Sequence, residues 1–449
     1  MDTPPQLAVD RLLDDRETRI IVCCGAGGVG KTTTAAALGV RAAERGRKAV
    51  VLTIDPARRL AQSMGIDSLD NTPRKVETVG AGDGELHAMM LDMKRTFDEI
   101  VEAHADAERA RAILANPFYQ SLSAGFAGTQ EYMAMEKLGQ LRARDDWDLI
   151  IVDTPPSRSA LDFLDAPKRL GSFLDGKFIR VLMAPAKVGG RAGMKFLNVG
   201  MSMMTGTLSK LMGASLLKDV QTFVAAMDTM FGGFRTRADA TFRLLQAPGT
   251  AFLVVAAPEA DALREAAYFV ERLAAENMPL AGLVLNRVHG SGADQLSAER
   301  ALAAAENLEE GGIVDQESGK AGLRDSGAEA TEPTEPTGTA ETAGSAETAR
   351  TAHSARTTRT TRTANPPESG SPGTEGDTAV VDRITAGLLR LHAERMQVIA
   401  REQRTRDRFT SLHPEVAVAE VAALPGDVHD LAGLRAIGER LAAGVPAGA

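Results

Sequence analysis

Short apolar runs recur along this chain, and most of them are followed by a stretch with helical spacing. The runs have the length and the β-branched content of buried strands, and they cover residues 19–24, 48–55, 147–153, 251–257, 280–286 and 415–423, with a weaker candidate at 86–91. Helical patterns fall between them, including 260–276 and 432–442. Strands alternating with helices predict an α/β fold with a doubly wound, mostly parallel sheet. In such sheets, ligands bind at the carboxyl ends of the strands.

The stretch 172–247 differs from its surroundings because it is rich in methionine and phenylalanine, with scattered glycine. Residues between 220 and 234 place their apolar side chains on one helical face. We expect a helical subdomain inserted into the sheet domain. Methionine is flexible and polarizable, which suits an adaptable apolar binding surface, but a methionine-rich helical core would give the same pattern.

A second departure is residues 291–378, where alanine, threonine, glutamate, glycine, serine and arginine replace almost all large apolar residues. Such a segment buries too little surface to offset its chain entropy, so it is predicted to be disordered. A helix is expected to follow at about 380–404. The expected organisation is an N-terminal tail (1–17), the first part of the core (18–171), the methionine-rich subdomain (172–247), the second part of the core (248–290), the insert (291–378) and the last part of the core (379–449).

The first strand leads into a glycine-rich loop, Gly25-Ala26-Gly27-Gly28-Val29-Gly30-Lys31-Thr32-Thr33, and then into a helix. This order satisfies the G-x-x-x-x-G-K-[ST] pattern, in which backbone N–H groups and a helix N-terminus hold phosphate groups. Lys31 would bring a positive charge to the β- and γ-phosphates, and the Thr32 hydroxyl would bind Mg²⁺. The sequence therefore predicts a nucleotide triphosphate site over residues 25–33.

Two carboxylates end neighbouring apolar runs. Asp153 closes the 147–153 run, where a carboxylate beside a phosphate loop holds Mg²⁺ directly or through water. Asp55 ends the second run and precedes Pro56-Ala57. We expect Asp55 to orient the water that attacks the γ-phosphate, with a structural cap for the next helix as the alternative.

Composition limits the class of protein. A formal net charge of −9 argues against general coating of nucleic acid. Cys23 and Cys24 are adjacent and lie in a predicted buried strand, which favours two small core residues over a metal pair. Met1 to Glu17 lacks the apolar core of a signal peptide, and no run reaches the length of a membrane span. We expect a cytoplasmic protein.

Five motifs occur in a fixed order along the chain: Gly27-Gly28-Val29-Gly30-Lys31-Thr32-Thr33, Asp55-Pro56-Ala57, Asp153-Thr154, Ala257-Pro258-Glu259 and Leu285-Asn286-Arg287. Taken together, they resemble the motifs of the ArsA/Get family of P-loop ATPases, which is related to MinD, ParA and the nitrogenase iron protein. The resemblance covers roughly residues 18–290 and 378–442. It implies a sheet of the SIMIBI type of P-loop NTPase, with ATP and Mg²⁺ as ligands and a dimeric assembly.

The resemblance also implies individual roles. Asp55 matches the aspartate of switch I that activates water, and Asp153 with Thr154 matches the start of switch II. Glu259 matches a glutamate that contacts nucleotide near the dimer interface. Asn286 matches an asparagine that reads adenine, and Pro425 lies in the loop that closes over the base. The methionine-rich stretch stands where the targeting members bind an apolar protein client.

Three features depart from the family pattern. The signature lysine of the deviant phosphate loop, which reaches the partner's nucleotide, is replaced by Ala26. A lysine-bearing paralogue in a heterodimer, or Arg58, Arg59 or Arg158 in a homodimer, would have to compensate. The zinc-binding C-x-x-C pair and the arsenite-binding cysteines are also missing, which disfavours zinc-clamped dimers, arsenite pumping and electron transfer.

The sequence thus predicts an ArsA/Get-like ATPase that uses ATP hydrolysis to reset a helical subdomain with an apolar client. One alternative is a nucleotide-gated subunit with little or no turnover, which Ala26 favours and Lys31 and Asp55 oppose. The other is a positioning ATPase like ParA or MinD. The last predicted helix resembles an ordinary docked helix rather than the membrane helix of MinD.

Overall fold

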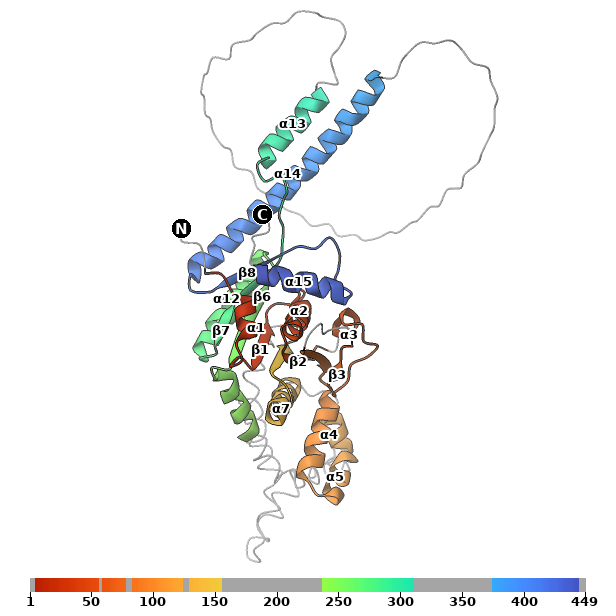
Figure 1. The fold of residues 1–449 in the computed structure, drawn as a ribbon, viewed down its shortest axis with the longest axis vertical. Coiled ribbons are helices and arrows are strands. Elements are labelled where there is room, and N and C mark those ends of the chain that lie inside the picture. Colours follow the sequence, from red (N-terminus) through yellow and green to blue (C-terminus); the bar gives the residue numbers. More distant parts are fainter. Residues whose placement is uncertain are drawn as a thin grey trace, which may run out of the picture. The chain divides into compact units, whose positions relative to one another are not determined.

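The computed structural model describes residues 5–55, 59–77, 83–123, 129–155, 236–310 and 374–443 (Figure 1). The chain forms two compact units. The first combines Met1–Leu296 with Glu394–Ala449, and the second is Ser297–Ala393.

The described residues of the first unit form an eight-stranded sheet with the order β3-β4-β2-β5-β1-β6-β7-β8. All neighbouring strands are parallel except β3 and β4. The strands are β1 (Ile20–Cys24), β2 (Lys48–Thr53), β3 (Arg74–Lys75), β4 (Glu85–Met90), β5 (Leu149–Asp153), β6 (Thr250–Ala256), β7 (Leu280–Val288) and β8 (Val418–Ala422). The predicted α/β fold with a mostly parallel sheet is confirmed. Strand β3 was not predicted, because two exposed residues give no periodic signal.

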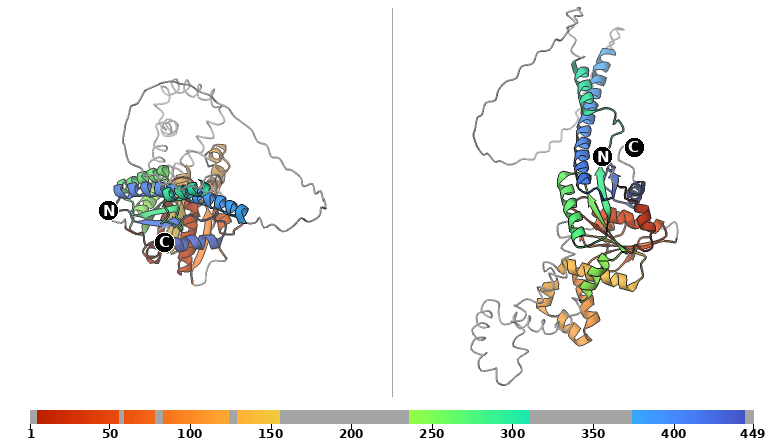
Figure 2. Two further views of the ribbon diagram at one scale, coloured as in Figure 1. Left: turned by 90° about the horizontal axis from the view of Figure 1, so that it is seen from above. Right: turned by 90° about the vertical axis from the view of Figure 1, so that its left-hand side faces the viewer.

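Helices cover both faces of the sheet (Figure 2). One face carries α1 (Val9–Asp14), α2 (Lys31–Glu44), α3 (Arg59–Ser63) and α15 (Leu431–Ala443). The other carries α4 (Met93–His104), α5 (Ala107–Leu114), α6 (Pro117–Ser123), α7 (Thr129–Arg144), a helix at 236–246 and α12 (Ala260–Ala275).

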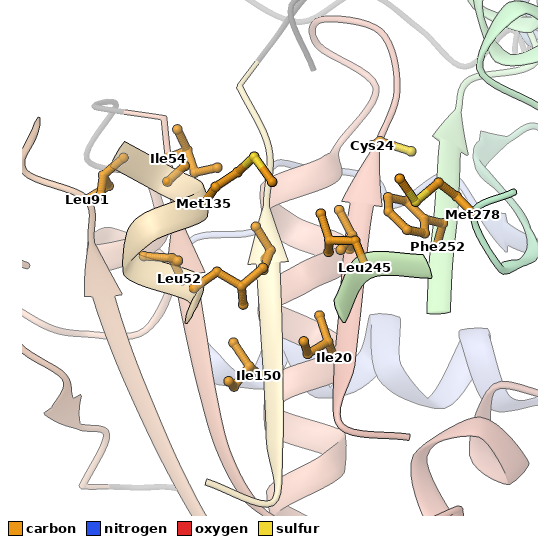
Figure 3. Packing of buried hydrophobic residues seen from close by; sticks show 14 of the residues in the cluster. Ile20, Cys24, Leu52, Ile54, Leu91, Met135, Ile150, Leu245, Phe252 and Met278 are labelled. Atoms are coloured by element: carbon orange, nitrogen blue, oxygen red, sulfur yellow. The ribbon is translucent and has the colours of Figure 1, made fainter. Parts of the chain in front are cut away.

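The alternation of side chains along β1 shows how one strand serves both cores. Ile20, Val22 and Cys24 point into the core beneath α7 and α12, as Figure 3 shows for Ile20 and Cys24. Ile21 and Cys23 point to the opposite core, against α2. Every residue of β1 is therefore buried, which explains a continuous apolar run instead of a polar–apolar alternation.

Residues 5–17 belong to the segment 1–17 that was predicted as an N-terminal tail, and they are part of the core. Leu7, Val9 and Leu13 are buried, and Gln6 forms a parallel bridge with Val418 of β8. The guanidinium of buried Arg47 donates to three carbonyl oxygens of the N-terminal region, those of Leu13, Asp15 and Thr18, and to the carbonyl oxygen of Asp148, at 2.7–2.9 Å. The prediction failed because a short segment that pairs only with a distant strand has no periodic signature of its own.

The predicted disorder of 291–378 is wrong at both ends of that segment. Residues Ala298–Glu310 form α13, and α14 (Thr374–Leu412) begins earlier than expected and is longer. Alanine supports α13 because it is the strongest helix former, and Ala301 and Ala305 are fully buried. Residues 311–373 lie outside the described residues.

Most of the methionine-rich stretch also lies outside the described residues. Of that stretch, the helix at 236–246 is described, with Ala238 and Leu245 in the core. Among the described residues, none of the helices combines the length and the apolar character needed to cross a lipid bilayer.

Candidate functional site

The glycine-rich loop lies between β1 and α2, at the carboxyl end of the central strand. Gly25, Gly28 and Gly30 have φ values of 146°, 77° and 95°, which L-residues with a side chain rarely adopt. A Cβ atom on Gly25 would lie 2.0 Å from the carbonyl oxygen of Val255, and one on Gly30 would lie 2.2 Å from Nδ2 of Asn286. The loop therefore needs these glycines both for its backbone conformation and for its close packing on β6 and β7.

Lys31 is the first residue of α2, and its side chain folds back over the loop. Its Nζ donates to the carbonyl oxygens of Gly25 at 3.0 Å and Ala26 at 2.7 Å. Burial lowers the pKa of Lys31, and the nearby carboxylates of Asp153 and Asp55 oppose that shift. The loop thus already holds a positive charge at the place where the sequence predicts the phosphates.

Asp153 ends β5 and is completely buried. Its Oδ2 accepts hydrogen bonds from the Thr32 hydroxyl at 2.7 Å and the Thr53 hydroxyl at 2.8 Å. Within the part of the chain that the structure describes, its Oδ1 is buried without a hydrogen-bond partner. Burial raises the pKa of Asp153 to about 6, against the opposing effect of the two hydroxyl donors and Lys31. A buried carboxylate with one unpaired oxygen beside a threonine hydroxyl is a donor set that fits Mg²⁺.

Sequence reasoning did not identify Thr53. It ends β2, and the register pairs it directly with Asp153 on the neighbouring strand. Its hydroxyl donates to Asp153 and also accepts from the backbone N–H of Asp55 at 3.2 Å. Thr53 therefore links the carboxylate of Asp153 to the backbone of Asp55, the two aspartates that the sequence singled out. A hydroxyl residue two positions before Asp55 was the available signal.

Asp55 follows β2, and it is half-buried on the same sheet edge as Asp153. The backbone before it is fixed, because the N–H of Ile54 donates to the carbonyl of Asp153 at 3.0 Å and Gln130 donates to the carbonyl of Ile54 at 2.9 Å. The structure thus brings Lys31, Thr32, Asp55 and Asp153 to one edge of the sheet.

The residues assigned to the nucleoside end are spread over three loops of that edge. Asn286 on β7 is buried, and its Nδ2 donates to the carbonyl of Val29 in the glycine-rich loop at 2.8 Å. Glu259 is exposed at the N-terminus of α12, after β6, and Pro425 is exposed after β8. Of these three, Asn286 touches the loop directly. Thr33 and Gly27 complete the predicted set, in the first turn of α2 and at the exposed tip of the loop.

The adjacent cysteines have a structural role in this arrangement. Both are buried in β1, and burial raises the pKa of the Cys24 thiol to about 12. The carbonyl oxygen of Cys23 accepts from the hydroxyl of Thr154 at 2.8 Å. Thr154 therefore ties the residue after Asp153 to the strand that leads into the glycine-rich loop.

A cavity of about 390 Å³ lies on the opposite face of the sheet from Lys31. Leu285 and Val288 of β7 line it, with the hydrogen-bonded pair His289–Glu402 and the ion pair Arg406–Glu420. Leu285 and Val288 belong to the core under α12, whereas α2 packs on the other face. The cavity is therefore separate from the phosphate site.

Comparison with known proteins agrees with this geometry. Residues 18–310 match the profile of the anion-transporting ATPase family. "ATPase GET3" of Podospora anserina is 25% identical over 308 residues, which cover 67% of this chain and 83% of that protein. "ATPase GET3" of Malassezia globosa is 30% identical over 167 residues, or 37% of this chain, so that this match spans about half (47%) of the relative. The "Putative arsenical pump-driving ATPase" of Halobacterium salinarum is 28% identical over 196 residues, covering 42% of this chain and 30% of that protein.

The family profile covers well over half of the chain and includes the glycine-rich loop, both aspartates and Asn286. This protein belongs to the ArsA family of anion-transporting ATPases.

Proposed function

We propose that this protein binds Mg-ATP at the glycine-rich loop and hydrolyses it. The observation that carries the proposal is the hydrogen-bonded set of Thr32, Thr53 and Asp153, directly beside the lysine-capped loop. The backbone of Gly25, Gly27, Gly28, Val29, Gly30 and Thr33, with Lys31, would hold the phosphates. Thr32 and Asp153 would hold Mg²⁺, which neutralises charge on the phosphate oxygens when bound.

In this proposal Asp55 orients the attacking water. Asp55 follows the strand end next to Asp153, and the Thr53 hydroxyl connects the Asp153 carboxylate to the backbone N–H of Asp55. A carboxylate in such a position acts by positioning the water and accepting its proton. Lys31 assists by stabilising the negative charge on the transferred phosphoryl group.

At the nucleoside end, we assign adenine contacts to Asn286 and Pro425 and a nucleotide contact to Glu259. Asn286 already bonds the glycine-rich loop. A base that contacts the Asn286 amide would therefore also affect the loop that holds the phosphates, through the hydrogen bond to Val29.

The wider cycle is also a proposal. Hydrolysis would change the loops after β2 and β5 and reset the helical subdomain at 172–247, which would bind an apolar protein client. We also propose that the core is divided into the segments 18–171, 248–290 and 379–449. The described strands of these three segments lie in one sheet, which supports this division. As relatives, "ATPase GET3" proteins and an arsenical pump-driving ATPase support ATP use rather than a particular client.

Ala26 favours a second candidate function, a nucleotide-gated subunit with little turnover. We assign Ala26 to the position of the signature lysine. It is 8% exposed, and its carbonyl binds Lys31. A homodimer would lack the cation that crosses to the partner's nucleotide, so a lysine-bearing paralogue would complete the site. Of the candidate substitutes, Arg58 and Arg158 lie outside the described residues, as does the Arg59 side chain.

Phosphate release and calorimetry with Mg-ATP on the full chain test these proposals. We expect Lys31→Ala to abolish binding. Asp55→Asn should retain binding and lose at least roughly 100-fold in turnover, the usual contribution of a catalytic base. Lys48→Ala is the matched control, because Lys48 is an exposed lysine at the amino end of β2.

Unchanged turnover in Asp55→Asn would refute its catalytic role. Tight binding without phosphate release by the unaltered protein, with turnover restored in Ala26→Lys, would instead favour the gated subunit. Absence of any heat with Mg-ATP would overturn both functions.

A further inference from the structure

Helix α14 carries an exposed aliphatic stripe in the second unit. Tyr268 aside, every large apolar residue that is exposed in the described part of the chain lies on this helix. The stripe consists of Val381, Ile384, Leu388 and Leu391, which are 58–63% exposed. A soluble protein rarely leaves such a continuous set uncovered unless it is an interaction surface.

The spacing of the stripe is that of a coiled-coil seam. Its members follow one another at intervals of three and four residues, the a and d positions of two heptads. The opposite face of the same helix is already occupied. Ala386 and Ala393 are fully buried, α13 runs alongside (Figure 2), and Arg390 pairs with Glu309 at 2.5 Å. Helix α14 therefore has one face that packs against α13 and one apolar face without a described partner.

The chain between α13 and α14 is poorly suited to cover the stripe. Residues 311–373 contain Ile313, Val314 and Leu323 as their only large apolar residues. A second observation points to another helix. Gly387 lies beside the seam in the middle of a 39-residue helix, and a Cβ atom there would meet nothing within 4 Å. Glycine weakens a helix interior, and no packing within the described residues requires it here, whereas close approach of a second helix would.

The pattern is self-complementary in the antiparallel direction. Two copies crossing at the level of residue 386 would place Val381 opposite Leu391 and Ile384 opposite Leu388, twice over. A parallel pair would set Arg395, the next a position, against its own copy. Those like charges disfavour the parallel arrangement. In the described structure Arg395 instead donates to the carbonyl of Gly290 at 2.8 Å, which ends the seam.

We propose that the occupant of this stripe is a second copy of the same chain, joined through an antiparallel pair of α14 helices crossing near Gly387. The contact requires no nucleotide, so it goes beyond the ATP-dependent dimer proposed above and does not depend on it. It would hold two ATPase units together throughout the cycle.

Sedimentation velocity of the full chain, in EDTA and free of nucleotide, tests the contact over about 1–50 µM, a range suited to a small interface. We expect concentration-dependent dimers in the unaltered protein and in Lys31→Ala. Leu388→Glu should weaken self-association at least roughly 100-fold, because it buries a charge at the centre of the seam. Leu412→Glu is the matched control, since Leu412 is a 66% exposed leucine on the same helix beyond the seam.

Gly387→Gln separates the interface from folding. It should raise the helical stability of α14 and also weaken the dimer, since a side chain would stand at the crossing point. Thermal unfolding followed by circular dichroism, with sedimentation on the same samples, measures both effects. Undiminished association of Gly387→Gln would overturn the close crossing.

Disulfide cross-linking fixes the orientation, because the native cysteines are buried. Mixing Val381→Cys chains with Leu391→Cys chains should give a mixed dimer under mild oxidation, whereas Val381→Cys alone should not cross-link. Cross-linking of Val381→Cys with itself would overturn the antiparallel arrangement. A monomer at every concentration, or a dimer unaffected by Leu388→Glu, would overturn the proposal and leave the stripe to another protein.

Discussion

Replacing Asp153 with asparagine should stabilise the nucleotide-free protein while removing its response to Mg-ATP. Burial raises the pKa of Asp153 from 3.8 to about 6. A shift of about two pKa units corresponds to about 3 kcal/mol of differential free energy between the protonated and ionised forms. At pH 8 the carboxylate is ionised, so the folded protein bears this whole cost.

Asparagine keeps the acceptor oxygen for the hydroxyls of Thr32 and Thr53 but carries no charge. Its amide nitrogen would stand at the place of Oδ1, which is buried and unpaired in the described structure, at a cost of about 1–2 kcal/mol. The net expectation is a gain of about 1–2 kcal/mol in the free energy of unfolding at pH 8.

The pH dependence has a definite sign. Because the folded-state pKa of Asp153 is raised, the folded protein binds more protons than the unfolded chain between pH 3.8 and about 6. This group therefore makes the protein less stable as pH rises through that window, and the loss is complete above pH 6. The asparagine variant lacks this contribution. The free energy of unfolding of the variant, relative to that of the unaltered protein, should therefore grow from pH 4 to pH 6 and then stay constant.

Urea unfolding in EDTA at pH 4.5, 6 and 8 measures the difference between the two proteins, and unfolding with Mg-ATP tests the site. We expect Mg-ATP to raise the stability of the unaltered protein but not that of Asp153→Asn. A variant that is less stable at pH 8 in EDTA, or one that keeps the full stabilisation by Mg-ATP, would refute the reasoning.

Three other substitutions or reagents probe different parts of the same core. Arg47→Ala should lower the free energy of unfolding in urea by at least about 3 kcal/mol, because four carbonyl oxygens would lose their buried guanidinium donor. The control Arg16→Ala should lower it by less than about 1 kcal/mol, because Arg16 is exposed, and equal losses would contradict this reasoning. Gly30→Ala should abolish ATP binding measured by calorimetry, because its Cβ would collide with the amide of Asn286 and φ is 95°; retained affinity would show that the loop can rearrange. A thiol reagent should not label Cys24 in the folded protein at pH 8, because burial raises its pKa to about 12, and should label it in urea; rapid labelling of the folded protein would contradict its burial.

The parts of the site that were predicted from sequence are those with local signatures. The glycine-rich loop, Lys31 and Thr32 form one continuous motif between a strand and a helix, and Asp153 ends an apolar run. Thr53 was missed because its role depends on the register of β2 against β5, which brings it opposite Asp153. Register between strands that are distant in sequence cannot be read from either strand alone.

The same limit explains the errors in the fold. The N-terminal segment packs around Arg47, which is buried because carbonyls from that segment and from Asp148 accept its hydrogen bonds. Composition marks unusual sequence after residue 290, but it did not predict α13, because alanine is common both in low-complexity segments and in helices. Buried Ala301 and Ala305 show that α13 forms because a second helix covers that small-residue face.

The bridge between Gln6 and Val418 imposes an order of events during synthesis. A ribosome makes Gln6 long before β8, so the segment around it must wait unpaired until almost the whole sheet exists. The backbone bonds from Leu7 to Val418 and from Val418 to Pro5 can form only then, at an entropic cost that rises with the length of the loop. Truncation within β8 would therefore detach the N-terminal segment as well. In a chain shortened at its carboxyl end, a protease would cleave first near the amino end.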